Sequence, residues 1–167
     1  MNSTKTDERY DLYCQLLDTL DEGCQLIVDY DSVPHDYGSA TLYQAESQII
    51  HLVGHQPGIT ANEIATMLRK TPSACSQLIR KLRKKELIRQ KRNKDNNRMY
   101  LLYLTEAGVK IFEDHNRFEK RCYQRTYENL KDFSEEDFKT YIAIQQKLNE
   151  TFAMDVEESN QDLLPGT

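Results

Sequence analysis

Two helix-start signals lie only 11 residues apart in the middle of the chain, and they constrain the fold more than any other feature. Thr60 and Glu63 form a Thr-x-x-Glu capping box, in which each side chain can bond a backbone N–H of the other residue. Thr71 is suited to cap a second helix, because Pro72 follows it at the first helical position, where a missing N–H does no harm. Apolar residues recur at spacings of three and four after both starts. The sequence therefore predicts two short helices in immediate succession.

A basic hairpin is predicted directly after these helices. Residues 87–92 and 99–104 are rich in strand-forming side chains, and the polar run 93–98 between them contains Asn, Asp and Lys. Two strands joined by such a loop make a β-hairpin, and a long helix is predicted from Glu106. Two helices, a hairpin and a return to helix are the elements of a winged helix-turn-helix. The expected fold class is mostly α with a small β-hairpin wing (α+β).

Positive charge is concentrated in the same stretch. Between Arg69 and Arg98 there are 12 Lys and Arg residues against two acids, whereas the rest of the chain has 10 bases and 25 acids. A chain that is acidic overall but collects its cations on one helix and one hairpin has the electrostatic footprint of a protein that binds nucleic-acid phosphates. A solvated basic face that binds nothing is the alternative, and the coincidence of the charge with the helix-turn-helix pattern argues against it.

The outward face of the second helix and the hairpin supply the predicted DNA-binding residues. Side chains near the start of such a helix can reach base edges in the major groove. Cations on the hairpin are expected at the minor groove or at flanking phosphates. The predicted set is Thr71, Ser73, Ser76, Gln77, Arg80, Lys81, Lys84, Arg92, Lys94 and Arg98.

These motifs resemble the MarR family of bacterial transcription regulators, which are dimeric winged-helix proteins, from about Tyr10 to Phe152. The matching segments, in their expected order, are residues 42–46, 57–60, 63–65, 71–76, 84–88 and 104–108. Asn96 stands where the family wing carries an acid, which here is Asp95, and Glu86 replaces a Gly expected after the recognition helix. The resemblance implies a dimeric DNA-binding transcription regulator, a repressor that binds a pseudo-palindromic operator and is released by an effector of unknown identity.

Long amphipathic helices are predicted at both ends of the chain. Residues 7–30 carry apolar side chains at alternating spacings of three and four. Residues 106–152 are predicted to form two further helices, the second of them capped by Ser134. A winged-helix DNA-binding lobe at residues 42–105 cannot bury all of these stripes. The terminal helices are therefore expected to be dimerisation helices that meet across a twofold axis in a homodimer.

The remaining features predict a single cytoplasmic domain over residues 1–167. The chain has enough apolar residues for one modest core, no run long enough to span a bilayer, and no signal-peptide pattern, so no membrane association is expected. Its four cysteines lack Cys-x-x-Cys spacing, which fits reduced thiols. Residues 31–39 are predicted as a loop from their Pro, Gly and Asp content, and the acidic residues 155–167 as a disordered tail.

Motifs of enzyme active sites are missing from the sequence, which has no Gly-rich phosphate loop, no Gly-x-Ser-x-Gly elbow and no His-Glu-x-x-His pair. We expect no enzymatic activity and no cofactor. His51 and His55, four apart on one helix, and His115 and Glu119, four apart on another, are the candidates for metal ligands. Exposed or packed histidines are the simpler interpretation, because the ligand-rich patterns of zinc-sensing relatives are not matched, and no metal site is predicted.

Cys14 is the candidate for a redox-sensing thiol, since it stands at about the place where peroxide-sensing relatives carry one. A buried cysteine on the apolar stripe is the simpler interpretation, because no neighbouring Lys, Arg or His is evident to lower its pKa, and no redox site is predicted. An organic small-molecule effector, or none, is expected in the crevice between the DNA-binding lobe and the dimer arm.

Two function classes follow from these patterns. The first is a dimeric transcription regulator that binds double-stranded DNA. The second is a winged-helix protein-interaction module whose basic face meets an acidic partner. Binding to a palindromic operator, compared with scrambled DNA at the same salt concentration, separates the two classes.

Overall fold

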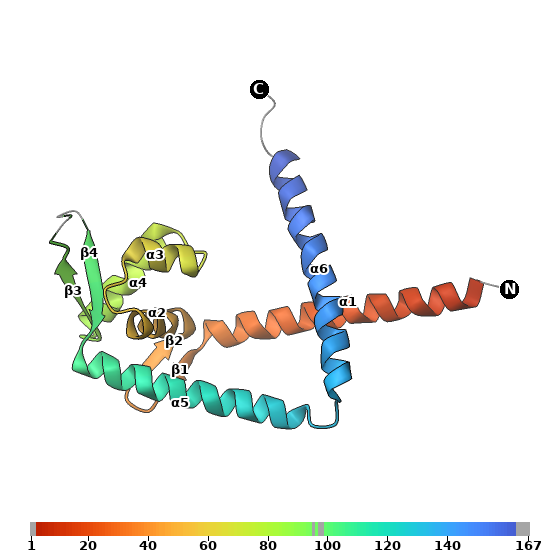
Figure 1. The fold of residues 1–167 in the computed structure, drawn as a ribbon, viewed down its shortest axis with the longest axis horizontal. Helices are drawn as coiled ribbons and strands as arrows, with labels where there is room; N and C mark the ends of the chain where they lie inside the picture. Colours follow the sequence, from red (N-terminus) through yellow and green to blue (C-terminus); the bar gives the residue numbers. More distant parts are fainter. Residues whose placement is uncertain (1–2, 95, 97–98, 163–167) are drawn as a thin grey trace. The chain divides into compact units, whose positions relative to one another are not determined.

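The computed structural model describes residues 3–94, 96 and 99–162. Its helices and strands confirm the expected fold class, mostly α with a small hairpin wing (Figure 1). In chain order they are α1 (Ser3–Ser32), β1 (Pro34–Asp36), β2 (Thr41–Tyr43), α2 (Gln44–His55), α3 (Ala61–Met67), α4 (Pro72–Lys84), β3 (Ile88–Arg92), β4 (Tyr100–Leu104), α5 (Glu106–Asn129) and α6 (Glu135–Asp162).

The chain divides into two compact units. The first, Met1–Glu119, contains α1 to β4 and the first part of α5; the second, Lys120–Thr167, contains the end of α5 and α6. Among the residues that the structure describes, no helix is both long enough and apolar enough to cross a membrane.

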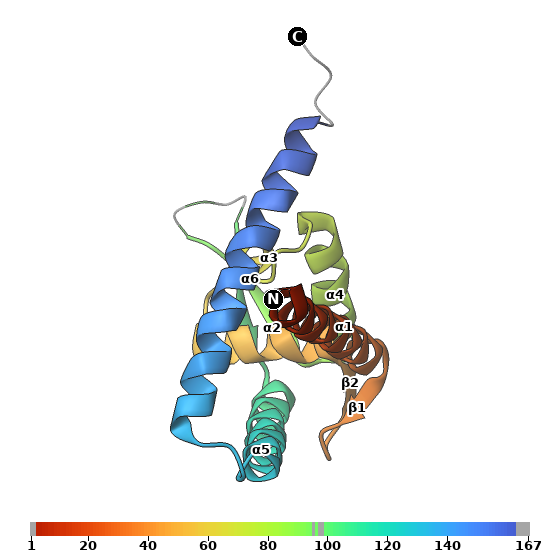
Figure 2. The same cartoon turned by 90° about the vertical axis from the view of Figure 1, so that its right-hand side faces the viewer.

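The core of the first unit lies between α2, α3, α4 and the β3–β4 hairpin. Figures 1 and 2 both show α2 next to the α3–α4 pair. Burying these side chains removes apolar surface from water and is the main force that holds the three helices and the hairpin together. The side chains that are most completely buried are Leu42, Ile49, Ile50, Val53, Ile59, Ile64, Cys75, Leu82, Leu102 and Ile111.

The predicted capping box at the start of α3 is confirmed. The Thr60 N–H donates to Glu63 Oε2 at 2.8 Å, and the Glu63 N–H donates to Thr60 Oγ1 at 3.3 Å. The hydrogen bonds from Thr60 lower the pKa of Glu63, because they stabilise its ionised form. The predicted wing is also present: β3 and β4 pair antiparallel, with Ile88 opposite Leu104 and Arg92 opposite Tyr100.

The prediction of a loop at residues 31–39 is wrong in part. β1 pairs antiparallel with β2, and the hairpin turns around Gly38, whose φ of +93° a side chain would disfavour. His35 and Tyr37 are buried, and the His35 ring lies 4.0 Å from that of Tyr30. Two strands of three residues are too short to show an alternating pattern in the sequence, and their stability depends on this aromatic packing.

Helix ends also differ from the predictions. α1 begins at Ser3 and ends at Ser32, beyond the predicted limits of 7 and 30. The prediction of a disordered tail at residues 155–167 is wrong for 155–162, which continue α6, while 163–167 lie outside the described residues. Composition led to that error, because acidic and polar residues cannot supply a core. Extending an existing helix needs no new nucleus, however, and Glu and Gln are good helix formers.

Glu86 supplies a first testable prediction. It follows α4 with a φ of +59°, in the left-handed region that costs an L-residue about 1 kcal/mol or more. We expect Glu86→Gly to raise the free energy of unfolding by about 0.5 to 1 kcal/mol, as measured by urea denaturation. Lys84→Gly, in the last turn of α4, is the matched control and is expected to lower it. A loss of stability in Glu86→Gly would contradict the prediction.

Candidate nucleic-acid interface

The start of α4 is built as its sequence predicts. Thr71 is the N-cap, and its hydroxyl accepts a hydrogen bond from the Ala74 N–H at 3.2 Å. Pro72 occupies the first helical position. Cys75, Ile79 and Leu82 are buried on one side of the helix and fix its rotation about its own axis. Burial raises the pKa of the Cys75 thiol, so this cysteine is a packing residue.

The opposite side of α4 is exposed, polar and cationic. Because the apolar residues hold the inner side against the core, these side chains all extend toward solvent from one helical face. The combination of hydroxyl, amide and guanidinium groups matches the donors and acceptors that base edges present in a major groove. The exposed residues of this face are Ser73, Ser76, Gln77, Arg80, Lys81 and Lys84.

Cationic side chains of the β3–β4 wing lie over the rings of two tyrosines, Tyr100 and Tyr103. Lys91 Nζ lies 5.3 Å from the centre of the Tyr103 ring, and the Arg89 guanidinium lies 5.8 Å from it. The Arg92 guanidinium lies 5.9 Å from the Tyr100 ring and donates a hydrogen bond of 3.4 Å to its hydroxyl. That hydrogen bond lowers the pKa of Tyr100. These contacts restrict the side-chain freedom of the wing cations before any ligand binds.

The predicted wing residues have different outcomes. Lys94 is exposed in the turn that follows β3, and Arg92 is exposed at the end of that strand. Arg98 lies outside the described residues, so its predicted contact with DNA stays a prediction.

An open groove of about 900 Å³ lies beside the end of α4. Its lining includes two arginines that are not among the predicted DNA-binding residues, Arg83 on α4 and Arg89 on β3. The periodic placement of Arg83 relative to Arg80 was the signal that could have identified it. The full lining is Arg80, Arg83, Lys84, Glu86, Ile88, Arg89, Gln90, Thr105, Glu106 and Ala107.

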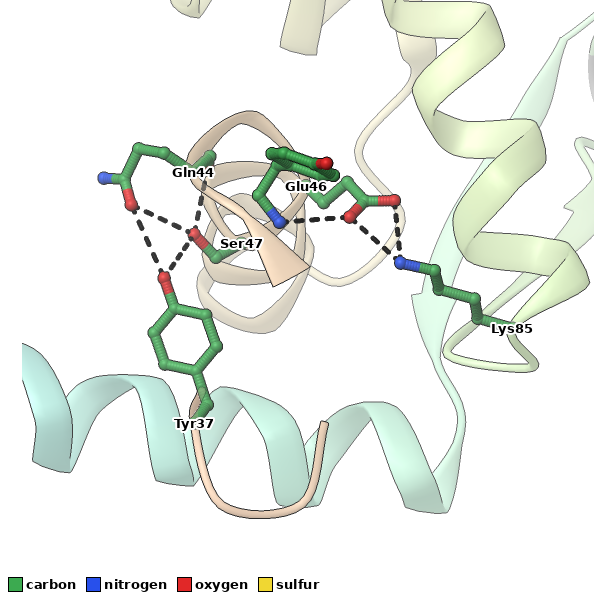
Figure 3. A network of polar contacts seen from close by, with 6 residues as sticks. Tyr37, Gln44, Glu46, Ser47 and Lys85 are labelled. Carbon is green, nitrogen blue, oxygen red and sulfur yellow. Dashed lines mark hydrogen bonds and ion pairs between the residues drawn. The ribbon is translucent and has the colours of Figure 1, made fainter. Parts of the chain in front are cut away.

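An ion pair that the sequence analysis missed holds the end of α4 to α2 (Figure 3). Lys85 Nζ lies 3.0 Å from each carboxylate oxygen of Glu46, and the Glu46 carboxylate also accepts the Tyr43 N–H at 3.2 Å. Glu46 is only 2% exposed, so removing Lys85 would leave a buried carboxylate without its counter-charge. Sequence spacing could not reveal this pair, because 39 residues separate its members.

A second polar contact in Figure 3 fastens the β1–β2 hairpin to α2. The Tyr37 hydroxyl donates to Ser47 Oγ at 3.1 Å, and Ser47 Oγ donates to the Gln44 carbonyl at 2.9 Å. On the other side of the hairpin, the Ser39 hydroxyl donates to the Asp114 carboxylate, which also pairs with Arg117. These bonds lower the pKa of Asp114, the one from Ser39 having the largest effect. The β1–β2 hairpin thus contacts both α2 and α5.

The structure brings only some of the candidate metal ligands together. His51, His115 and Glu119 each offer a ligand atom, and these atoms lie within 4.8 Å of one another. His55 is not a member of this group, although its ring lies 4.4 Å from that of His51. Burial lowers the pKa of His115, an effect that Glu119 opposes and His51 reinforces. Cys14 is partly buried on α1, and its redox role stays a prediction.

The sequence is similar to those of known transcription regulators. A family model described as "MarR family" matches residues 42–99. The HTH-type transcriptional regulator PchR of Bacillus subtilis is 22% identical over 156 residues, which are 92% of each chain. The transcriptional regulator ZitR of Lactococcus lactis is 30% identical over 94 residues, 56% of this chain and 64% of ZitR.

Solved structures extend the similarity to most of the chain. A crystal structure of L. lactis ZitR, described as a zinc-responsive MarR family member, superposes with a TM-score of 0.71 at 22% identity, covering 84% of this chain and 99% of ZitR. Wild-type ZitR in complex with DNA superposes with a TM-score of 0.68 at 23% identity, covering 82% of this chain and 97% of ZitR. The transcriptional regulator SlyA gives 0.67 at 19% identity, over 85% of this chain and 99% of SlyA. The winged-helix fold is therefore shared.

Proposed function

We propose that the chain is a transcription regulator of the MarR family, whose model matches residues 42–99, and that it binds double-stranded DNA as a homodimer, with α4 in the major groove and the β3–β4 wing beside it. The observation that carries this proposal is the exposed face of α4, where Gln77, Arg80, Lys81 and Lys84 extend from a helix that is rigidly capped and packed on its other side. The structure of ZitR in complex with DNA supports the same role for this fold.

Exposed apolar side chains support the dimer. Soluble monomers rarely expose large numbers of contiguous apolar side chains, whereas the surfaces that join subunits do. A C2 dimer would cover these side chains and would hold two α4 helices at the spacing of one helical turn of DNA. On α1 they are Tyr10, Leu12, Tyr13, Leu26, Ile27, Val28 and Tyr30, and on α6 they are Tyr141, Ile142, Ile144, Phe152, Met154 and Val156.

Repression is the regulatory outcome that we propose. A dimer that occupies an operator near a promoter hinders access of RNA polymerase to the same DNA, and the operator of a C2 dimer is a pseudo-palindrome. The test is a titration of the full-length protein with palindromic segments of the DNA upstream of its own gene and with scrambled DNA of the same composition, at matched salt. Tighter binding to one segment supports the proposal. Equal affinity for all of them would favour the protein-interaction alternative.

Gln77 and Lys94 provide a prediction about the division of labour within the interface. Gln77 lies on the exposed face of α4, where its amide can pair with a base, whereas Lys94 lies in the turn after β3, where its ammonium group is expected to neutralise phosphate. We expect Gln77→Ala to narrow the difference between operator and scrambled DNA by about 1 to 3 kcal/mol, with little change in salt dependence. We expect Lys94→Ala to weaken binding to both DNAs and to reduce the slope of log K against log salt by about one unit.

The two variants are each other's controls. Fluorescence anisotropy at four or more salt concentrations measures affinity and slope together. If both variants lost the same affinity on both DNAs, with the same change of slope, α4 would not be the reading element and the proposed orientation on DNA would be wrong.

A further inference from the structure

A cluster of two histidines and one glutamate lies between α2 and α5. His51 comes from α2, and His115 and Glu119 come from α5, all within the first unit. The spacing of four residues places His115 and Glu119 on the same face of α5, one turn apart. The ligand atoms of the three side chains lie within 4.8 Å of one another. Residues far apart in the sequence thus present three potential metal ligands to one point.

The imidazole nitrogens of this cluster are incompletely satisfied. Nδ1 of His51 and Nδ1 of His115 are buried and have no hydrogen-bond partner among the described residues. Buried polar atoms are nearly always paired, so two such atoms in one cluster need an explanation. Packing against apolar neighbours does not explain these two atoms, because a buried nitrogen without a hydrogen-bond partner is destabilising. A cation bound to these imidazoles would give the polar atoms a role.

The surroundings of the cluster favour charge–charge interactions. The His115 ring lies 5.1 Å from that of Tyr37, and the His51 ring lies 6.1 Å from that of Phe112. Aromatic walls exclude water and lower the local dielectric constant, which strengthens the attraction between a cation and the Glu119 carboxylate. His115 is buried, whereas His51 and Glu119 are partly buried, so two of the three side chains are accessible to an entering ion.

We propose that His51, His115 and Glu119 bind a divalent transition-metal ion, of which Zn²⁺ is the first to test. Two imidazoles and one carboxylate are a donor set that zinc uses, with a fourth position left for water. Ligand atoms around tetrahedral zinc are about 3.3 Å apart, given metal–ligand distances of about 2.0 to 2.2 Å. The ligand atoms lie within 4.8 Å of one another, so the side chains need to close by no more than about 1.5 Å, and rotation of the partly buried His51 and Glu119 can provide this movement. The bound ion would join α2 to α5.

The direct test uses full-length, tag-free protein that has been stripped of metal with a chelator. Zn²⁺ alone is the probe, and its binding is measured by competition with a fluorescent zinc indicator. We expect one Zn²⁺ per protomer, and with Co²⁺ the visible absorption bands of a four-coordinate ion. This measurement does not involve DNA, so absence of Zn²⁺ binding would not contradict the proposed DNA binding. Absence of DNA binding would likewise not contradict the proposed Zn²⁺ site.

Single substitutions decide whether these three residues are the ligands. We expect His51→Gln, His115→Gln and Glu119→Gln each to weaken Zn²⁺ binding by about 100-fold or more, since even residues that only orient ligands are worth 10- to 100-fold. His55→Gln is the matched control, because His55 contacts His51 on the same helix but lies outside the cluster. We expect the Zn²⁺ affinity of this variant to stay within about threefold of that of the parent protein.

Thermal unfolding guards against variants that merely fail to fold. Glu119→Gln changes a partly buried side chain to one of the same shape, so it is expected to fold and to lose the rise in Tm of a few degrees that excess Zn²⁺ gives the parent protein. Unchanged Zn²⁺ affinity in all three variants, or an equal loss in His55→Gln, would overturn the proposal. So would the absence of Zn²⁺ binding by the parent protein at micromolar concentration.

Discussion

Gly108→Ala is expected to lower the free energy of unfolding by about 3 kcal/mol. A Cβ atom at this position would lie 2.0 Å from the carbonyl oxygen of Leu87 and 3.3 Å from Cβ of Leu104. The Leu87 oxygen is a backbone atom that accepts the Thr105 N–H at 3.1 Å, so it cannot move aside without loss of that bond. Relief would require α5 to shift away from the base of the wing, and such overpacking against backbone lies at the costly end of core substitutions.

Gly23→Ala is the matched control, because a Cβ at Gly23 would have no other atom within 4 Å. As a mid-helix replacement of Gly by Ala, it is expected to leave stability unchanged or to raise it by up to about 1 kcal/mol. Urea denaturation followed by circular dichroism measures both variants. A loss of less than 1 kcal/mol in Gly108→Ala would show that α5 and the wing base are free to separate.

Ile27→Asp is expected to raise the dissociation constant of the homodimer by about 100-fold or more. Ile27 lies on the apolar stripe of α1 and is 63% exposed in the protomer, so a carboxylate there should not disturb the protomer fold. The dimer interface would bury two such carboxylates, one from each protomer, without counter-charges, at a cost of about 3 kcal/mol or more. Operator affinity should fall as well, because each α4 would then bind its half-site alone.

Gln15→Asp is the control for Ile27→Asp, since it adds the same charge at an exposed polar position of α1, about 120° around the helix axis from Ile27. Sedimentation velocity over a range of micromolar concentrations measures the two variants and the parent protein. A parent protein that sediments as a monomer, or an Ile27→Asp variant as dimeric as Gln15→Asp, would show that this stripe of α1 is not the dimer surface.

The sequence was most informative where short-range chemistry decides the structure. The caps at Thr60 and Thr71, the proline at position 72 and the strands of the wing were all predicted, because each signal acts within four residues or repeats with a fixed period. The exposed face of α4 could be predicted for the same reason, since three buried residues determine which side of the helix points outward. Whether those side chains read DNA bases is a question for the titrations above.

Long-range contacts were beyond the reach of pattern analysis. The β1–β2 hairpin depends on His35 and Tyr37, which pack against Tyr30 and His115 from other parts of the chain. The close approach of His51 to Glu119 depends on how α2 crosses α5, and helical spacing within either helix cannot reveal it. The continuation of α6 through Asp162 was missed because composition is informative about burial and much less about whether an existing helix continues.

The ion pair between Glu46 and Lys85 divides two neighbouring lysines between different tasks. Lys84 is exposed on the face of α4 that points to solvent, whereas Lys85 has its ammonium group between the two oxygens of a buried carboxylate. A cation whose charge is already balanced releases few counterions when phosphate approaches. The ionic valence of this surface toward a polyanion is therefore smaller than the number of lysines and arginines in its sequence, and the fold decides which of them count.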